Sequence, residues 1–356
     1  MRADNAGQNP PVENPLRNVV VRAEPANVGM TASNSTPFLL YGVLLFSIGI
    51  AGFLLGVLLV FPRYILDLHG LLDPVAAWLV WYSGIPCVLG LSLAVFDLLV
   101  LLRRKKPNAA IRYEALANRK VTVALTAYND EESIADAVKD FLAHPLVARV
   151  IVVSNNSRDQ TFMRAQAAGA VCFNELQPGY GRCVFRCLSE AIKLDDVDLI
   201  VLCEGDRTFR AYDIEKLLAY APHADIVNGT RTVEPLRQYT TQLTTFMFYG
   251  NVFVGKLLEA KYLGRGTITD VGTTYKLCRR DALARLLPYV NPAINLEFNA
   301  HFLDMALNRS LVLVECPITF HSRVGLSKGG NVSNWRGFQV GLRMIAGIVL
   351  GWRSAA

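Results

Sequence analysis

Two long apolar runs without a charged residue constrain this chain more than any other feature of its sequence. No Asp, Glu, Lys or Arg occurs in the 25 residues from Pro37 to Phe61 or in the 23 residues from Pro74 to Phe96. A helix of about 20 residues, rising ~1.5 Å per residue, crosses the hydrocarbon core of a bilayer. The first run begins too late and is too long to be the apolar part of a signal peptide. The sequence therefore predicts a hairpin of two transmembrane helices over residues 36–103.

The composition and the basic residues give this hairpin an expected orientation. Of the 356 residues, 52% are hydrophobic and 19% are charged, which favours a membrane component. Four basic residues at 103–106 directly follow the second run, whereas the loop at 62–73 carries one Arg. Because basic loops stay on the cytoplasmic side, we expect an integral protein of the inner (plasma) membrane whose later residues are cytoplasmic. Asp97, near the cytoplasmic end of its helix, is expected to meet water or a basic neighbour.

The tail, the linker, the cysteines and the net charge limit which binding partners the sequence predicts. Residues 1–35 are rich in Asn, Pro, Ala and Ser and predict a disordered tail, and residues 104–119 predict a linker. The seven cysteines show no C-x-x-C spacing, which disfavours a structural metal site. The net charge of +6 gathers beside the apolar runs and suits anionic lipid, so no nucleic acid partner is expected. The sequence leaves open whether the chain forms a homo-oligomer.

Between residues 120 and 328 short β-branched runs alternate with stretches that have helical spacing of apolar residues. This alternation predicts one α/β domain with a mostly parallel sheet that helices cover on both faces. Ligands of such sheets bind beyond the carboxyl ends of the strands. Polar clusters follow three of the predicted strands: Tyr128-Asn129-Asp130, Ser154 to Asp159, and Glu204-Gly205-Asp206. The strands are predicted at 121–126, 149–153, 170–173, 199–203 and 225–228.

The residue types in these clusters suggest a site for a nucleoside diphosphate. Glu204 and Asp206 offer hard oxygen ligands for Mg²⁺ or Mn²⁺, which would bridge two phosphates. Asp206, with the shorter side chain, is expected to bind the metal directly, and Glu204 through water or a ribose hydroxyl. The alternative is a helix cap. A base could stack on Tyr128 while Asn129 reads its edge, and Asp159 could contact the nucleotide or fix the turn.

Two further segments bear on ligand binding. Gly179 and Gly181 open a predicted helix and would let the backbone approach a ligand, although a plain turn explains them equally well. His321, at the end of the domain's last strand, is a candidate third metal ligand or diphosphate contact, with a structural role as the alternative. Residues 329–356 carry Trp near both ends of a mostly apolar stretch and predict an interfacial amphipathic helix.

Five motifs occur in an order that resembles glycosyltransferase family 2, of the GT-A type. Within that family they are similar to the polyprenyl-phosphate glycosyltransferases related to dolichyl-phosphate mannose synthase. Thr126 and Asp130 frame a segment like P-x-Y-N-E, and Ser154 and Asn155 replace the Asp pair of D-D-G-S-x-D. The other three are Glu204-Gly205-Asp206 in place of D-x-D, the acceptor-framing segment from Thr269 to Leu283, and Glu315 to Lys328, which is close to E-V-P-I-x-(Y/F)-x-x-R-x-G-x-S-K.

The resemblance implies a membrane-bound, inverting transfer of a sugar from a nucleotide-diphosphate sugar to a polyprenyl phosphate. A lipid phosphate is already ionised at neutral pH and needs cations rather than a base, and four basic residues are expected near it. They are Arg231, Lys276, Arg323 and Lys328. The chain lacks the Q-x-x-R-W segment of the processive polysaccharide synthases.

Two alternatives stay open. A lipid or glycan hydroxyl is a poor nucleophile and would need a base, for which Asp270 and Glu297 are the candidates. Glu297 equally suits the start of a helix, where the dipole favours a negative charge. A degenerate domain serving as a non-catalytic membrane scaffold is the other alternative, because Thr126, Ser154 and Glu204 depart from the family pattern.

Overall fold

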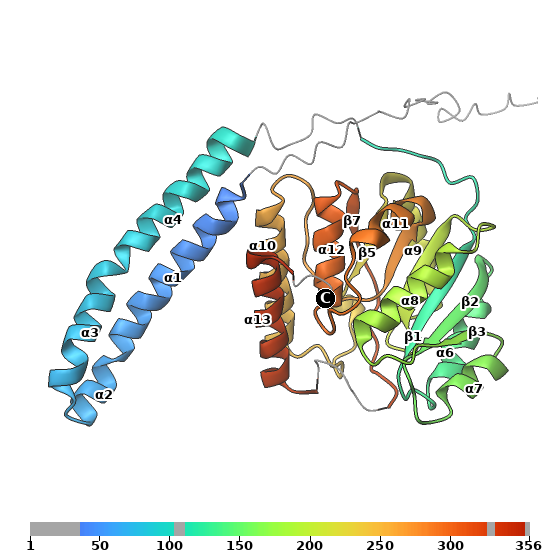
Figure 1. Ribbon diagram of the computed structural model, residues 1–356, viewed down its shortest axis with the longest axis horizontal. Helices are drawn as coiled ribbons and strands as arrows, with labels where there is room; N and C mark the ends of the chain where they lie inside the picture. Colours follow the sequence, from blue (N-terminus) through green and yellow to red (C-terminus); the bar gives the residue numbers. More distant parts are fainter. Residues whose placement is uncertain (1–35, 103–110, 326–331, 353–356) are drawn as a thin grey trace, which may run out of the picture. The chain divides into compact units, whose positions relative to one another are not determined.

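The computed structural model describes residues 36–102, 111–325 and 332–352, which form a helical hairpin and an α/β domain (Figure 1). The predicted tail at 1–35 and the first part of the predicted linker lie outside the described residues. The rest of the linker, residues 111–119, has no helix or strand.

The two apolar runs form the arms of the hairpin. Both arms, Phe38–Ile65 with 28 residues and His69–Leu101 with 33, are long and apolar enough to cross a membrane. The first arm consists of α1 (Phe38–Leu58) and α2 (Val60–Ile65). The second consists of α3 (His69–Tyr82), α4 (Gly84–Phe96) and the π-helical turn η2 (Asp97–Leu101).

Small residues let the two arms approach closely. A Cβ atom on Gly42 would lie 2.6 Å from the carbonyl oxygen of Gly90, and one on Gly49 would lie 2.7 Å from that of Ser83. Such contacts are how helices pack where no hydrophobic effect drives them together. Asp97 is fully buried, and its Oδ2 accepts a hydrogen bond of 2.7 Å from the Leu39 amide. The Asp97 carboxylate therefore binds the amino-terminal end of α1, where the helix dipole favours it.

The domain contains a seven-stranded sheet in the order β3-β2-β1-β4-β6-β5-β7. The pairs β1–β2, β1–β4, β2–β3 and β5–β7 are parallel, and β6 runs antiparallel to both β4 and β5. The mostly parallel sheet and the five predicted strands are confirmed, with ends that differ by up to two residues. β6 was not predicted, and the last strand, which was expected to end at His321, is β7 and ends at Pro317. The strands are β1 (Val121–Ala127), β2 (Val147–Ser154), β3 (Val171–Asn174), β4 (Leu199–Glu204), β5 (Ile226–Thr230), β6 (Lys276–Arg279) and β7 (Leu313–Pro317).

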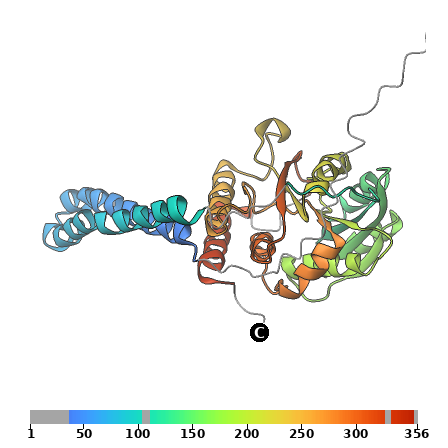
Figure 2. The same cartoon turned by 90° about the horizontal axis from the view of Figure 1, so that it is seen from above.

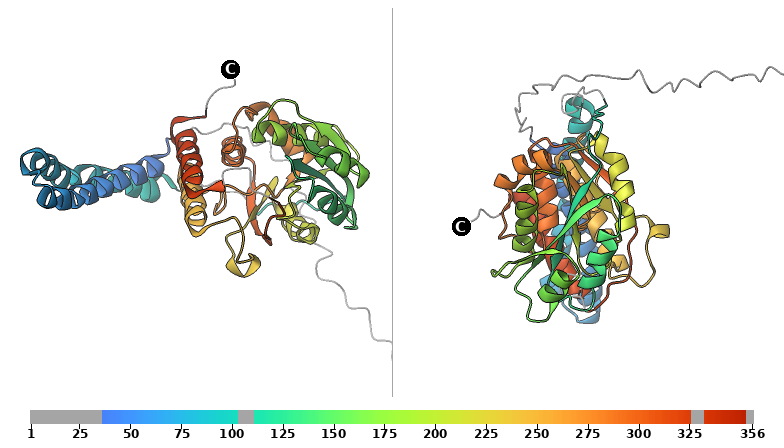
Figure 3. Two further views of the ribbon diagram at one scale, coloured as in Figure 1. Left: turned by 90° about the horizontal axis from the view of Figure 1, so that it is seen from below. Right: turned by 90° about the vertical axis from the view of Figure 1, so that its right-hand side faces the viewer.

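Helices cover both faces of this sheet, as the alternation of the sequence predicts (Figure 3, right panel). In β1, Ala124 packs with one helical layer and its neighbours Val123 and Leu125 pack with the other. The first layer contains α8 (Tyr180–Ile192), α11 (Arg280–Leu286) and α12 (Phe298–Asn308). The second contains α6 (Ile134–Leu142), α7 (Thr161–Ala167) and α9 (Ile214–Tyr220). Short 3₁₀ turns lie at Ala211–Asp213, Ala221–His223, Glu234–Leu236 and Leu287–Tyr289.

Two longer helices, α10 (Thr245–Lys261) and α13 (Asn334–Leu350), lie side by side at one end of the domain (Figures 1 and 2). The helix α13 lies within the segment 329–356, for which the sequence predicts an interfacial helix, and the Ser333 hydroxyl caps it by accepting from the Arg336 amide at 3.2 Å. Asp304 on α12 is fully buried and ties these elements together. Its carboxylate accepts from Lys261 at 2.9 Å and from the Trp352 indole at 2.6 Å.

Candidate functional site

One cavity of about 930 Å³ lies at the carboxyl ends of the parallel strands and continues along α10 and α13. Its polar end receives Thr126 from β1, Asn155 from the turn after β2, and both Glu204 and Asp206 from the end of β4. Its other end is lined by apolar side chains of the two helices, among them Phe246, Phe253, Val254, Phe338, Leu342 and Ile345. Parallel topology explains the polar end, because it brings the ends of successive strands to one edge.

Some of the residues assigned to nucleotide binding face this cavity. Tyr128 lines it with 45% of its surface exposed, which leaves its ring available for stacking. Asn155 also lines it, but its side chain holds the following loop by donating to the Gln177 carbonyl at 2.9 Å and accepting from the Gly179 amide at 3.0 Å. Arg158 lines the same end and was not singled out from the sequence.

Three other predicted nucleotide contacts build the turn instead of lining the cavity. The Ser154 and Ser157 hydroxyls are 2.8 Å apart. The Asn129 side-chain oxygen accepts from the Arg158 amide at 2.8 Å. The Asp159 Oδ1 accepts from the Thr161 amide at 3.0 Å, which matches the turn-fixing alternative. These side chains set the shape of the loop after β2, and their predicted contacts with a nucleotide have no support in the geometry.

The glycines likewise divide between lining and packing. Gly179 lines the cavity and adopts a φ of 139°, which other residues rarely adopt. A Cβ on Gly181 would lie 1.8 Å from the Ile294 carbonyl oxygen, and one on Gly205 would lie 2.4 Å from the Ile134 side chain. Gly181 and Gly205 therefore allow close packing between elements, rather than close approach of a ligand.

Three carboxylates and one guanidinium form the charged centre of the cavity. Arg323 Nη1 lies 3.0 Å from Asp206 Oδ2, and its Nη2 donates to Asp130 Oδ1 at 2.6 Å. Asp206 Oδ1 also accepts from the Thr208 amide and hydroxyl at 3.0 and 2.6 Å. Burial, and then the negative charge of Asp206, raise the pKa of Glu204 to about 7. The arrangement concentrates negative charge where a cation can bind.

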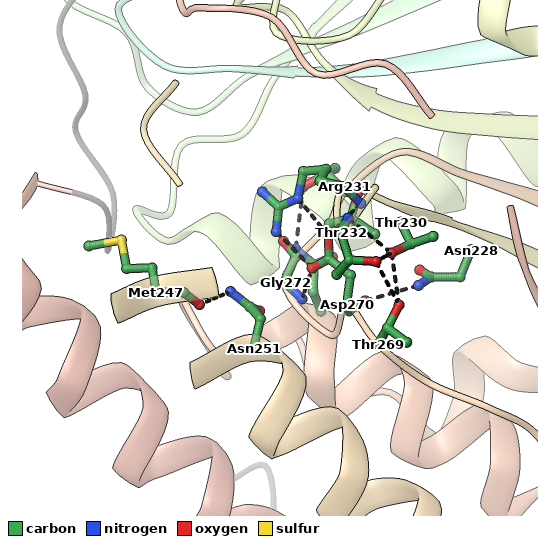
Figure 4. Close-up of polar contacts among 12 residues, drawn as sticks. Asn228, Thr230, Arg231, Thr232, Met247, Asn251, Thr269, Asp270 and Gly272 are labelled. Atoms are coloured by element: carbon green, nitrogen blue, oxygen red, sulfur yellow. Dashed lines mark hydrogen bonds and ion pairs between the residues drawn. The ribbon is translucent and has the colours of Figure 1, made fainter. Parts of the chain in front are cut away.

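Arg231 and Asp270 form a buried ion pair beside this centre (Figure 4). Asp270 accepts from Arg231 Nε at 2.7 Å, from its Nη2 at 2.8 Å and from the Gly272 amide at 3.1 Å. Burial alone would raise the pKa of the Asp270 carboxyl, but the charge and hydrogen bonds of Arg231 outweigh burial and hold it below its ordinary value. Arg231 lines the cavity, whereas Asp270 lies behind it.

Neither candidate base faces the cavity. Asp270 is occupied by Arg231, and Glu297 Oε1 lies 2.6 Å from Arg343 Nε. Glu297 lies directly before the first residue of α12, as the helix-start alternative predicts. On this stretch the residues that line the cavity include Asn295, which precedes α12, and Asn299 within α12.

The other predicted ligands have different positions from those expected. His321 Nε2 and the Tyr212 hydroxyl are 2.7 Å apart, and the described residues contain no group of three His, Cys, Asp or Glu side chains suited to a metal. The metal role of His321 is therefore not supported. Lys276 is fully buried and donates to the Thr273 carbonyl, so it does not reach a phosphate in the cavity. Lys328 lies outside the described residues.

Residues 122–287 match the family model described as Glycosyl transferase family 2. The matched segment comprises 166 of the 356 residues, a little under half of the chain, and it supports a glycosyltransferase. The match begins in β1 and ends after α11, so it includes the strand ends that carry Thr126, Glu204 and Asp206.

Curated relatives agree with this glycosyltransferase domain. Protein RfbJ of Shigella flexneri is 29% identical over 113 residues, which are 31% of this chain and 84% of RfbJ. An uncharacterized glycosyltransferase of Mycobacterium tuberculosis, Rv0539, is 34% identical over 117 residues, 33% of this chain. The match spans half of the length of Rv0539. Glucosyl-3-phosphoglycerate synthase of Mycolicibacterium smegmatis is 38% identical over 100 residues, 24% of this chain and 33% of that enzyme.

Solved structures show the same fold. Glucosyl-3-phosphoglycerate synthase of Mycobacterium tuberculosis, in complex with Mn²⁺, UDP-glucose and phosphoglyceric acid, superposes with a TM-score of 0.50 at 18% identity. The superposition covers 67% of this chain and 82% of that chain. A further mycobacterial protein gives a TM-score of 0.50 at 19% identity and covers 71% of this chain and 79% of that one. At this identity the likeness concerns the GT-A fold alone.

Proposed function

We propose that this protein transfers a sugar from a nucleotide-diphosphate sugar to a polyprenyl phosphate at a membrane surface. One observation carries the proposal: a single cavity joins the charged centre at Glu204 and Asp206 to a long apolar wall formed by α10 and α13. A soluble acceptor makes no use of such a wall. An isoprenoid chain buries apolar surface against it, which stabilises the complex by about 25 cal/mol per Å².

The donor would bind at the polar end with Mg²⁺ or Mn²⁺. Asp206 and Glu204 fit a divalent cation, because both are carboxylates and both face the same cavity. Asp206 would hold the ion directly and Glu204 would hold it through water or a ribose hydroxyl. The metal would neutralise the departing nucleoside diphosphate. Tyr128 and Thr126 would flank the nucleoside, while Arg158 adds a positive charge at that end.

The charged side chains that line the cavity bear on the identity of the acceptor. Among the described residues, the carboxylates that line it are Asp130, Glu204 and Asp206. Arg323 pairs with Asp130 and Asp206, and Glu204, which accepts from Thr274 at 2.6 Å, is assigned to the metal, so we assign none of the three as the base. A hydroxyl acceptor needs a base, whereas a phosphate is already ionised. Arg231 and Arg336 line the cavity and would bind that phosphate by their guanidinium groups. Direct displacement of the diphosphate would invert the sugar.

The remaining chain would keep the site at the bilayer. The two arms of the hairpin would span the membrane, and the basic residues after the second arm would leave the domain in the cytoplasm. On α13, Trp335, Phe338 and Leu342 are 67%, 41% and 49% exposed, which suits a helix lying at the membrane interface.

Transfer of a radiolabelled sugar tests this proposal. Membranes that contain the full chain receive a panel of nucleotide sugars and undecaprenyl phosphate, with either Mn²⁺ or EDTA. We expect a labelled glycolipid from one donor, which is lost in EDTA and in Asp206→Ala. The matched control is Asp196→Ala, whose side chain is 52% exposed and pairs with Arg149 away from the cavity. If the protein is folded and no donor gives a glycolipid, the proposal is contradicted. A labelled product formed on a soluble acceptor would show that the acceptor is not a lipid.

A further inference from the structure

We propose that Lys276 is a positioning residue for Glu204, acting through a directed chain of hydrogen bonds that passes through Asn299, Tyr180 and Thr274. The inference rests on the proposed function, in which Glu204 takes part in holding the metal and donor. It assigns a role to a buried lysine that does not line the cavity and so cannot contact substrate.

The chain begins at a group that fixes the orientation of an amide. The Lys276 Nζ donates to the Thr273 carbonyl and to Asn299 Oδ1, the latter at 3.3 Å. The protonated Lys276 ammonium has three donors and no acceptor, and the oxygen of Asn299 faces it. Burial lowers the pKa of Lys276 to about 7, and the negative charge of Asp270 acts in the opposite direction by favouring the ammonium form. Asp270 is already paired with Arg231, which leaves the amide of Asn299 as the side-chain acceptor for Lys276 among the described residues.

Once its oxygen is fixed, Asn299 must direct its amide protons the other way. Its Nδ2 lies 3.1 Å from the Gly272 carbonyl, 3.0 Å from the Tyr180 hydroxyl and 3.3 Å from Thr274 Oγ1. The Tyr180 oxygen therefore accepts from Asn299. Its own proton is free to be donated onward.

The last two bonds carry this direction to Glu204. Thr274 donates its single hydroxyl proton to Glu204 Oε1 at 2.6 Å. It must therefore accept from the Tyr180 hydroxyl, which lies 2.5 Å away. Every donor in the chain points from Lys276 toward Glu204. The Thr274 bond then fixes the plane in which the Glu204 carboxylate meets a metal ion or a ribose hydroxyl.

Loss of the ammonium removes the constraint at the start of the chain. Without Lys276, the Gly272 carbonyl is left to oppose a turn of the Asn299 amide. If the amide does turn over, its oxygen faces Tyr180, which then donates to Asn299. Thr274 loses the donor that keeps its own proton on Glu204. Residues that orient a metal ligand in this way change metal affinity by about 10- to 100-fold when they are mutated.

Mn²⁺ binding measured by electron paramagnetic resonance, with and without UDP, tests the inference on the full chain in detergent. Lys276→Met and Thr274→Val should each weaken Mn²⁺ binding by about 10-fold or more. Because both break one chain, the double variant should bind no more weakly than the weaker single variant. Thr273→Val is the matched control: its hydroxyl is buried and has no hydrogen-bond partner among the described residues, so Mn²⁺ binding should change by less than about twofold.

Wild-type Mn²⁺ affinity in folded Lys276→Met, or losses that multiply in the double variant, would overturn the inference. If Lys276→Met does not fold, Tyr180→Phe interrupts the same chain and must show the same loss. A wild-type protein that binds no Mn²⁺ would contradict the proposed metal site instead. In that case the unfolding temperatures of the wild type, Lys276→Met, Thr274→Val and the double variant test the hydrogen-bond chain. Additive effects of the two substitutions would overturn it, and non-additive effects would support it.

Discussion

The guanidinium of Arg323 lies 3.0 Å from the Asp206 carboxylate, although Asp206 follows β4 and Arg323 follows β7. The same guanidinium reaches Asp130 at 2.6 Å, and all three side chains are at most 13% exposed. A divalent ion bound at Asp206, as proposed, would therefore compete with Arg323 for the same oxygen. Once displaced, Arg323 would be available to bind the phosphates. It would thus pair with carboxylates in the metal-free protein and bind phosphate, as the sequence predicts, in the metal-bound protein.

Replacement of Arg323 should change the response of the protein to metal. Arg323→Met leaves Asp130 and Asp206 without their shared cation, so the metal-free protein should unfold at a lower temperature. Mn²⁺ should restore that stability, and the Mn²⁺-induced rise in unfolding temperature should be larger than in the wild type. Thermal unfolding with and without Mn²⁺ measures this. Arg210→Met is the control, because Arg210 forms a two-pronged pair with Asp140 and does not line the cavity. An equal Mn²⁺ response in Arg323→Met and Arg210→Met would be inconsistent with competition.

Asp270 should act on stability and on the placement of Arg231, and not as a base. Asp270→Asn leaves the buried Arg231 charge uncompensated, which costs about 3–5 kcal/mol in the free energy of unfolding. Combining it with Arg231→Met removes that charge and should recover part of the loss. Chemical denaturation of the single and double variants measures both effects. Unchanged stability together with lost activity in Asp270→Asn would revive the hydroxyl acceptor.

The sequence predicted the sheet and the polar end of the cavity for the same reason. Strands buried on both faces have recognisable β-branched runs, and parallel strands bring their ends together. The strand β6 was missed because Lys276 and Arg279 stand at its ends and resemble surface residues. Burial of Lys276 depends on Asn299, a contact between distant segments that no local pattern records. The ion pairs Glu297–Arg343 and Arg231–Asp270 also join distant segments, so no local pattern in the sequence predicts them.

The stability of the domain should depend on pH through His301. Burial, and then the Lys261 charge, lower the pKa of His301 to about 4, and its Nε2 accepts from the Asn291 amide at 2.9 Å. The unfolded chain binds a proton near its ordinary pKa of about 6.5, so between those values the unfolded state holds more protons. Stability should therefore fall as pH drops from about 6.5 toward 4. Unfolding temperatures measured between about pH 4 and about pH 6.5 should depend less on pH in His301→Gln than in the wild type. An equal dependence in both proteins would show that other groups cause the loss of stability in acid.

The packing of the hairpin can be tested at two glycines of the same helix. A side chain at Gly49 meets the Ser83 carbonyl at 2.7 Å and the Cys87 sulfur at 2.4 Å, whereas one at Gly52 finds its nearest neighbour at 4.0 Å. Gly49→Leu should separate the arms and speed the alkylation of Cys87 by N-ethylmaleimide in detergent. Gly52→Leu should leave that rate unchanged. Mass spectrometry of the alkylated peptide provides the rate, and equal rates in the two variants would contradict the close packing at Gly49.

The acceptor is the central claim, and a comparison of two lipids tests it most directly. Purified protein in mixed micelles receives its labelled donor with either a polyprenyl phosphate or the polyprenol of the same length, so the two acceptors differ in the phosphate alone. We predict a glycolipid from the phosphate and none from the alcohol, because guanidinium groups line the described cavity and we assign its carboxylates to Arg323 and to the metal. Transfer to the alcohol at an equal or greater rate would contradict the account.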